Sequence, residues 1–200
     1  MDNLRISRRA LMLAGLGMAV GGCIPTGRPT LTTGFDPKTF DPARDLDPRF
    51  RRQQVDFSGP DQAGTIVVNT SERFLYAVEP GGTAMRYGVG VGEEGLSFKG
   101  TAKIGRKADW PSWTPTASMI ERKPRLAQYA GGVPGGPNNP LGARAMYLYQ
   151  GGQDTMFRVH GTNEPWTIGT AVSNGCIRLT NDDIIDLYDR TPVGTVVRVI

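Results

Sequence analysis

Short apolar runs alternate with turn residues from residue 64 onward, and this rhythm limits the fold more than any other feature of the chain. The run Thr65–Asn69 is rich in β-branched residues, and Arg73–Val78 follows it after a polar turn, so the two runs predict a β-hairpin. Thr83–Val91 continues the pattern. The 200 residues include 27 glycines and 15 prolines, a content that disfavours a helical bundle. The sequence therefore predicts a mainly β fold rich in loops.

The C-terminal part of the chain predicts further strands and the clearest helix. Ala145–Tyr149 and Thr155–His160 are typical of central strands, and the second run ends on the single histidine of the chain. A helix with one apolar face follows, and either Thr180 or Asn181 can cap its N-terminus. Thr195–Ile200 then predicts a last strand that closes the sheet.

Residues 105–143 form a long segment that contains two of the three tryptophans and many glycines and prolines. A connection of this length in a compact domain is commonly functional, so we predict long active-site loops here. Trp110 and Trp113 are expected to anchor the segment. The run Gly131–Pro137 suits either the flank of a lid or a mobile turn, and the sequence leaves both open.

The first 22 residues predict an export signal. Arg8 and Arg9 precede the apolar run Ala10–Val20, which is shorter than the roughly 20 residues of a spanning helix but suits a secretory signal. An arginine pair fits twin-arginine export and also occurs in ordinary Sec signals, so the route stays open. Val20-Gly21-Gly22-Cys23 resembles a lipobox, which predicts a lipid anchor on Cys23. Plain cleavage near the two glycines is the alternative.

Residues 23–62 predict a tether that joins this signal to a catalytic domain at residues 63–200. Prolines recur at six positions, charges alternate and the apolar residues have no period, so little surface can be buried. Within the tether, Arg51–Phe57 is a candidate edge strand for the domain.

Charge and cysteine content exclude several classes of function. The formal net charge of +4 falls to +2 without the three arginines and one aspartate of the leader, and there is no basic–aromatic stripe, so no nucleic acid partner is expected. Two cysteines in an exported chain normally suggest a disulfide, but lipidation of Cys23 would leave Cys176 free. One histidine and two distant cysteines do not make a structural zinc site, so no metal is expected.

The residues that carry chemistry are Cys176 and, sixteen positions earlier, His160. A free cysteine titrates at about 8.5 and becomes a good nucleophile at neutral pH when a neighbour such as imidazole helps it to ionise. His160 is the only histidine, so it has no competitor as the base. Gly175 allows close backbone approach, and the N–H groups of Gly175 and Cys176 can face an oxyanion. Either side chain alone is more often structural, so the combination carries the prediction.

Two runs, Val159–Asn163 and Ser173–Arg178, together resemble the signature of the L,D-transpeptidases, bacterial enzymes that remodel peptidoglycan with a catalytic cysteine. The resemblance covers the chain from about residue 63 onward and implies a β-sandwich of mixed sheets with a short helix near the C-terminus. Asn174 stands where many relatives carry a second histidine, and Phe98–Gly100 lacks a Thr-Pro pair, which puts substrate preference in doubt. Further matching runs are Gly64–Asn69, Arg73–Tyr76, Tyr87–Gly92, Trp110–Pro115, Pro137–Gly142 and Ala145–Leu148.

The resemblance also implies a mechanism. His160 takes the thiol proton of Cys176, and the thiolate attacks the diaminopimelate carbonyl of a stem tetrapeptide. The N–H groups of Gly175 and Cys176 stabilise the oxyanion, D-alanine leaves, and the thioester passes to an amine. The backbone carbonyl of Gly161 completes the triad by orienting the imidazole. No metal or nucleotide cofactor is implied.

Five further residues are candidates for substrate binding, each with a structural alternative. Arg178 can hold a substrate carboxylate or pair with an acid that fixes the loop. Ser173 and Asn174 can bond the donor peptide or shape the turn before the cysteine. Tyr147 and Trp166 can line the pocket or belong to the core.

Three functions compete at this point. The first is a transpeptidase that makes 3→3 crosslinks, attaches a protein amine to the wall, or exchanges the terminal D-amino acid. The second is an L,D-carboxypeptidase or amidase that hydrolyses the same acyl-enzyme. The third is a non-catalytic wall-binding lipoprotein, which has no need of Cys176 and His160. The resemblance implies peptidoglycan stem peptides as partners, penems and carbapenems as inhibitors, and a periplasmic, membrane-anchored location.

Overall fold

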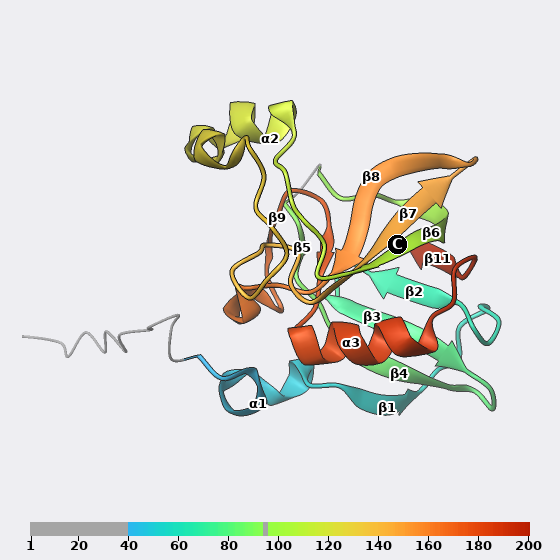
Figure 1. The fold of residues 1–200 in the computed structure, drawn as a ribbon. Coiled ribbons are helices and arrows are strands. Elements are labelled where there is room, and N and C mark those ends of the chain that lie inside the picture. Colours follow the sequence, from blue (N-terminus) through green and yellow to red (C-terminus); the bar gives the residue numbers. More distant parts are fainter. Residues whose placement is uncertain (1–39, 94–95) are drawn as a thin grey trace, which may run out of the picture. The chain divides into compact units, whose positions relative to one another are not determined.

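The computed structural model describes residues 40–93 and 96–200, and this part of the chain is mainly β, as predicted (Figure 1). Within these residues, nine strands form one mixed sheet in the order β1-β4-β3-β2-β11-β6-β7-β8-β10, and β5 pairs with β9 in a small parallel sheet. The strands are β1 Gln53–Asp56, β2 Ile66–Asn69, β3 Phe74–Glu79, β4 Thr83–Gly88, β5 Val91–Gly92, β6 Gly100–Asp109, β7 Arg144–Gln150, β8 Gln153–His160, β9 Ala171–Ser173, β10 Ile177–Arg178 and β11 Val196–Val199.

The helices are few and short, and the predicted one near the C-terminus is confirmed as α3. The Thr180 hydroxyl caps this helix by accepting a hydrogen bond from the Asp183 N–H at 3.2 Å. The Asn181 side chain has another task, since its oxygen accepts from the Ala143 N–H at 2.9 Å. The helices are α1 Pro42–Asp45, η2 Pro48–Phe50, α2 Ala117–Arg122, η3 Pro124–Tyr129, η4 Pro165–Thr167 and α3 Asn181–Arg190.

The first half of the large sheet is an antiparallel meander of β2, β3 and β4, so the predicted hairpin is confirmed. The turn between β2 and β3 is stabilised by the Asn69 side chain, which accepts from the N–H groups of Ser71 and Glu72 at 3.2 and 3.1 Å. The last strand, β11, runs parallel to β2 and antiparallel to β6. It therefore joins the two halves of the sheet, as expected of a strand that closes it.

Both halves of the large sheet and α3 contribute to a single apolar core. Ile184 and Leu187 on α3 are completely buried among side chains from both halves. Figure 1 shows α3 lying across the strands that it covers. Strand side chains that complete this core include Val68, Leu75, Tyr87, Ile104, Met146, Leu148, Val159 and Val197.

Residues 40–62 contain ordered elements that pack on the rest of the described chain. Strand β1 pairs antiparallel with β4 at the edge of the large sheet, which confirms the expected edge strand. Leu46 and Phe50 are buried with Ile168 in a second apolar cluster, so this part of the expected tether buries surface. The division at residue 62 stays a prediction. The predicted export signal, Cys23 and the first part of the tether lie outside the described residues.

The long segment at 105–143 begins later than predicted, because residues 105–109 belong to the ten-residue strand β6. The alternation that marks a strand is interrupted at Gly105, where the pairing of β6 with β7 shifts register. The rest of the segment is not featureless, since it contains α2 and η3, which stand away from the large sheet (Figure 1). We refer to residues 110–143 as the arm.

Candidate active site

Strand pairing brings Cys176 and His160 together. Strand β10 runs parallel to the end of β8, with Ile177 opposite Val159 and Arg178 opposite His160. Ile177 and Val159 are buried in the core. Because successive side chains of a strand point to opposite faces, Cys176 and His160 lie on the other face of the sheet. The predicted pair is therefore assembled by the register of two neighbouring strands.

The loop before Cys176 depends on Gly175, which has a φ of 115°. A Cβ atom at this position would lie 2.5 Å from the Leu96 carbonyl oxygen and 2.6 Å from the Phe157 ring. The loop also packs against β5, since a Cβ on Gly92 would lie 2.7 Å from the Gly175 Cα. Glycine is therefore required at 175 by both its conformation and its surroundings.

Ser173 holds the shape of this loop. Its hydroxyl donates to the Cys176 carbonyl at 2.6 Å and accepts from the Gly175 N–H at 3.2 Å. The Ser173 side chain is buried, so its position suits the turn-shaping alternative. The Gly175 N–H is thereby directed at Ser173 and not at the space in front of the thiol. The Cys176 N–H, by contrast, makes no hydrogen bond within the described residues.

His160 is buried and oriented by its neighbour in the chain. Its Nδ1 lies 2.5 Å from the Gly161 carbonyl oxygen, the partner that the resemblance implied. Gly161 is itself fixed, because its N–H donates to the Arg144 carbonyl at 3.0 Å. A Cβ at Gly161 would lie 2.4 Å from the Asn181 side-chain oxygen. With Nδ1–H donated to this carbonyl, the imidazole keeps its lone pair on Nε2.

The electrostatics of the pair favour two neutral side chains. Burial lowers the pKa of His160 to about 3, and the positive charge of Arg178 acts in the same direction. Burial raises the pKa of the Cys176 thiol, although the backbone and the charge of Arg158 act to lower it. The thiol therefore differs from the expectation of a lowered pKa, because removal from water outweighs the nearby positive charge.

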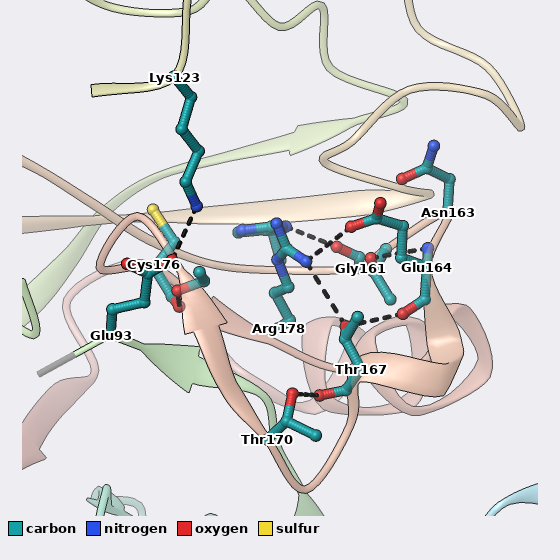
Figure 2. Close-up of polar contacts among 12 residues, drawn as sticks. Glu93, Lys123, Gly161, Asn163, Glu164, Thr167, Thr170, Cys176 and Arg178 are labelled. Carbon is teal, nitrogen blue, oxygen red and sulfur yellow. Dashed lines mark hydrogen bonds and ion pairs between the residues drawn. The ribbon is translucent and has the colours of Figure 1, made fainter. Parts of the chain in front are cut away.

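Arg178 pairs with an acid and fixes the loop that follows His160. Its guanidinium donates to the Glu164 carboxylate at 2.9 Å and to the Thr167 hydroxyl at 3.5 Å (Figure 2). The backbone of Arg178 exchanges two hydrogen bonds with Gly90, at 2.8 and 2.9 Å. This arrangement is the structural alternative of the two that the sequence left open.

Three adjoining cavities lie around the Cys–His pair, and Cys176 lines two of them. A central cavity of about 50 Å³ is lined by Cys176 and His160 together with arm residues. The strand pocket, of about 320 Å³, includes Cys176 and lies over β6, β7 and β8. The loop pocket, of about 530 Å³, lies between the arm and the segment around η4. Trp113 lines all three cavities, so the arm borders the thiol on both sides.

The remaining candidates for substrate binding divide between these places. Tyr147 lines the strand pocket. Asn174 lines the loop pocket and the central cavity, and its buried side-chain oxygen has no hydrogen-bond partner within the described residues. Trp166 packs edge-on against Phe40, with ring centroids 6.3 Å apart, and is not among the described residues that line the three cavities.

Sequence reasoning missed several charged residues around the site, including Arg125 and Glu164 of the loop pocket. Arg106 and Arg158 line the strand pocket. Lys123 and Glu93 line the loop pocket and form an ion pair at 2.8 Å that ties the arm to the end of β5 (Figure 2). Only alternation along β8 could have placed Arg158 on the face of His160. The others depend on contacts between distant segments.

This geometry defines a class of protein: a mainly β domain in which a Cys–His pair lies where two parallel strands meet. The family model described as the L,D-transpeptidase catalytic domain matches residues 63–199, and the chain belongs to this family. A putative L,D-transpeptidase from the ATP synthase subunits region of Fuscovulum blasticum is 35% identical over 98% of both chains. The probable L,D-transpeptidase YbiS of Escherichia coli K12 is 39% identical over 68% of this chain, which spans only 44% of that relative.

Solved structures show the same fold. An L,D-transpeptidase from Mycobacterium smegmatis has a TM-score of 0.50 at 20% identity, covering 68% of this chain and 58% of that one. A Brucella melitensis protein, described as a probable carnitine operon oxidoreductase, is 54% identical, with a TM-score of 0.53 and coverage of 75% of this chain and 93% of that one. That description names another activity, but the family membership of this chain rests on its own matched domain and relatives.

Proposed function

We propose that this chain is a peptidoglycan L,D-transpeptidase in which Cys176 is the nucleophile and His160 the base. The acyl donor is a stem tetrapeptide, and the bond broken joins the L-centre of diaminopimelate to the terminal D-alanine. The observation that carries the proposal is the placement of a half-buried thiol and a buried imidazole in one cavity, with the imidazole oriented through Nδ1.

The first half-reaction forms a thioester. His160 Nε2 takes the thiol proton as Cys176 Sγ attacks the diaminopimelate carbonyl carbon. The Cys176 N–H, which is unpaired within the described residues, donates to the oxyanion of the tetrahedral intermediate. His160 then returns the proton to the leaving amino group, and D-alanine departs.

The second half-reaction transfers the acyl group to an amine. The acceptor attacks as a neutral amine: the amine nitrogen bonds to the thioester carbon while His160 Nε2 takes a proton from that nitrogen. The imidazolium then gives the proton to the Cys176 sulfur, which leaves as the thiol. The acceptor is a second stem peptide, a protein amine or a D-amino acid. The loop pocket suits such an acceptor, because it places Glu93 and Glu164 beside Lys123, Arg125 and Arg178. A zwitterionic amino acid centre matches that mixed lining.

Proton transfer accompanies attack in this account. Both pKa shifts favour the neutral thiol and the neutral imidazole in the free protein, since burial disfavours a charged form of either group. The resting enzyme therefore holds a neutral thiol and a neutral imidazole, and the imidazolium forms as the sulfur attacks the donor.

Hydrolysis of the same acyl-enzyme, as in an L,D-carboxypeptidase or amidase, is the second candidate. The strand pocket of about 320 Å³ that Cys176 lines favours it, because water can enter this space as well as an amine. A non-catalytic wall-binding role is a weaker proposal, since it gives no reason for the orientation of His160 by Gly161.

The cellular setting follows from the same proposal. We expect an exported, periplasmic protein held to a membrane by a lipid on Cys23, and acylation of Cys176 by penems and carbapenems. Within the described residues, no helix has the length and apolar character to cross a membrane. Labelling with a radioactive fatty acid tests the anchor: incorporation is expected in the wild-type chain and not in Cys23→Ala.

The reaction itself is tested with the purified full chain and a disaccharide-tetrapeptide. Release of D-alanine together with a crosslinked dimer is expected for the wild type, and neither product for Cys176→Ala. D-Alanine without a dimer and without an acyl adduct of an added amine acceptor, at every concentration of that acceptor, would replace transfer with hydrolysis. Equal rates for the wild type and Cys176→Ala would contradict both enzymatic candidates.

A further inference from the structure

The strand pocket beside Cys176 has cationic side chains in its lining. It is bordered by two arginines, Arg106 and Arg158, and the described residues that line it include no aspartate or glutamate. The loop pocket on the other side differs, since its cations are accompanied by two glutamates. The two spaces next to the thiol therefore present different charges to a ligand.

The two arginines sandwich one aromatic ring. The guanidinium carbon of Arg106 lies 3.5 Å from the centroid of Tyr147, and that of Arg158 lies 4.3 Å from the same centroid. Tyr147 is almost completely buried. Stacking uses the face of a guanidinium and leaves its in-plane N–H donors free for a hydrogen-bonding partner.

Only one of the two arginines has its donors occupied. Arg158 binds Asp154 through two hydrogen bonds, at 2.6 and 2.9 Å, and also donates to the Phe157 carbonyl at 2.9 Å. The Arg106 side chain makes no hydrogen bond or ion pair within the described residues, where its partner is the Tyr147 ring. Arg158 is thus a fixed support, and Arg106 presents free donors to the pocket.

Two irregularities of the sheet produce this stack. Arg106 and Arg158 both lie opposite Tyr147 in register, from β6 and β8 respectively. The register of β6 shifts at Gly105, and that of β8 shifts between Asp154 and Arg158, where Met156 has a φ of 65°. Bulges next to active sites commonly re-aim side chains.

The stack is also aligned with the nucleophile. Ile177 lies opposite Val159, so the preceding residue on each strand, Cys176 and Arg158, are neighbours on the same face. The order across the sheet is therefore Cys176, Arg158, Tyr147 and Arg106. Adjacent strands are about 4.8 Å apart. The distance from the thiol to Arg106 can therefore be spanned by one extended side chain of the substrate together with the Arg106 side chain.

We propose that Arg106 binds a carboxylate of the acyl donor in the strand pocket and is a specificity-determining residue, positioned by Tyr147 and Arg158. This inference rests on the proposed function and names the side of Cys176 that the donor occupies. The proposed partner is one of the two carboxylates that stay in the acyl group, at the D-centre of diaminopimelate or on the α-carbon of the D-glutamate before it, and not the carboxylate of the leaving D-alanine. A planar guanidinium binds either group through two parallel hydrogen bonds.

The test compares Arg106→Gln with the wild-type full chain on three donors: the free-acid disaccharide-tetrapeptide, the form amidated at diaminopimelate, and the form amidated at D-glutamate. For the free acid, we expect KM to rise about tenfold in Arg106→Gln, with little change in kcat. The donor that lacks the recognised carboxylate should have a raised KM with the wild type and no further rise in Arg106→Gln. Lys103→Gln, which removes an exposed cation of the same strand outside the three cavities, is the matched control and should leave the donor KM unchanged.

Arg106→Lys separates recognition by the planar guanidinium from attraction by positive charge alone. Its KM should lie between the values of Arg106→Gln and the wild type. Alkylation of Cys176 by iodoacetamide, a neutral reagent, should proceed at the same rate in Arg106→Gln and the wild type. An equal KM rise on all three donors, or none on any, would overturn the inference while leaving the proposed function in place.

Binding measurements distinguish a failure of the carboxylate subsite from a failure of the proposed function. In the Cys176→Ala background, the free-acid donor should bind about tenfold more weakly when Arg106→Gln is added. Arg106-dependent binding without turnover by the wild type would contradict the proposed function and support the carboxylate subsite. Binding that is equal with and without Arg106 would contradict the subsite.

Discussion

The strands and the arm that border Cys176 are built in different ways. On the strand side, the positions of His160, Arg158 and Arg106 follow from the pairing of β6, β7, β8 and β10. Facing these strands, the arm borders the thiol on both sides and is shaped by scattered contacts, such as the two backbone bonds within it between Trp113 and Val133, at 2.9 and 2.7 Å. Under the proposed function, the difference separates two tasks: the ladder fixes the groups that do chemistry, and the arm forms walls that can vary with the acceptor.

The strand side should be the less tolerant of change, and Gly175→Ala is the most severe test. The new Cβ meets the Leu96 carbonyl and the Phe157 ring at a φ of 115°, so we expect a loss of about 3 kcal/mol of unfolding free energy and most of the activity. Urea denaturation measures the first effect. Gly194→Ala is the matched control, because its φ of 96° is similar but its surroundings are open. Equal costs at the two glycines would contradict the tight packing of the cysteine loop.

Asn139 is a buried polar anchor of the arm. Its amide donates to the carbonyls of Val133 and Pro134, both at 2.9 Å, and its oxygen accepts from the Leu141 N–H at 2.8 Å. Asn139→Ala leaves these buried groups unpaired, so we expect a loss of about 2 kcal/mol. The exposed neighbour Asn138 supplies the control Asn138→Ala, which should change stability little. Asn139→Ala should leave the rate of Cys176 alkylation unchanged and weaken acceptor binding. That result would support a division of tasks between the strands and the arm.

The pH dependence of stability probes the strand side at His160. Its folded pKa of about 3 lies below the unfolded value of 6.5, so between these pH values the unfolded chain binds a proton that the native chain does not. The stability is therefore fully present above pH 6.5 and falls with decreasing pH, by roughly 1.4 kcal/mol per unit from this group. Denaturation of the wild type and His160→Gln from pH 7 to pH 4.5 compares the slopes. A wild-type slope no steeper than that of His160→Gln would mean that the imidazole charges in the native state.

The smallest effect is expected at the ion pair between Lys123 and Glu93. Both side chains are partly exposed, and such pairs contribute little to global stability. Lys123→Gln should leave the melting temperature unchanged within error and increase hydrogen exchange over residues 117–129. Arg122→Gln, an adjacent exposed change, should alter neither. A large fall in melting temperature for Lys123→Gln would show that the arm is as firmly built as the strand side.

The sequence predicts the parts of this molecule that depend on local pattern. The hairpin of β2 and β3 and the capped helix α3 follow from runs of a few neighbouring residues. The family signature drew attention to Cys176 and His160 before the strands that bring them together were known. These features need no knowledge of distant contacts.

The parts that the sequence did not reveal depend on irregular pairing and long-range contact. The second half of strand β6, residues 105–109, was mistaken for loop, because Gly105 interrupts its alternation with a bulge. The stack of Arg106 on Tyr147 exists only once that bulge has set the register. The raised pKa of the Cys176 thiol likewise depends on burial by segments that lie far away in the chain.

The central claim is that Cys176 carries the acyl group, and intact-mass spectrometry of the full chain tests it most directly. The wild type, mixed with the disaccharide-tetrapeptide and quenched in acid, should gain the mass of the donor minus D-alanine. Peptide mapping should place the addition on Cys176, and Cys176→Ala should gain nothing. An addition on another residue, or D-alanine released by the wild type and Cys176→Ala alike, would contradict the account.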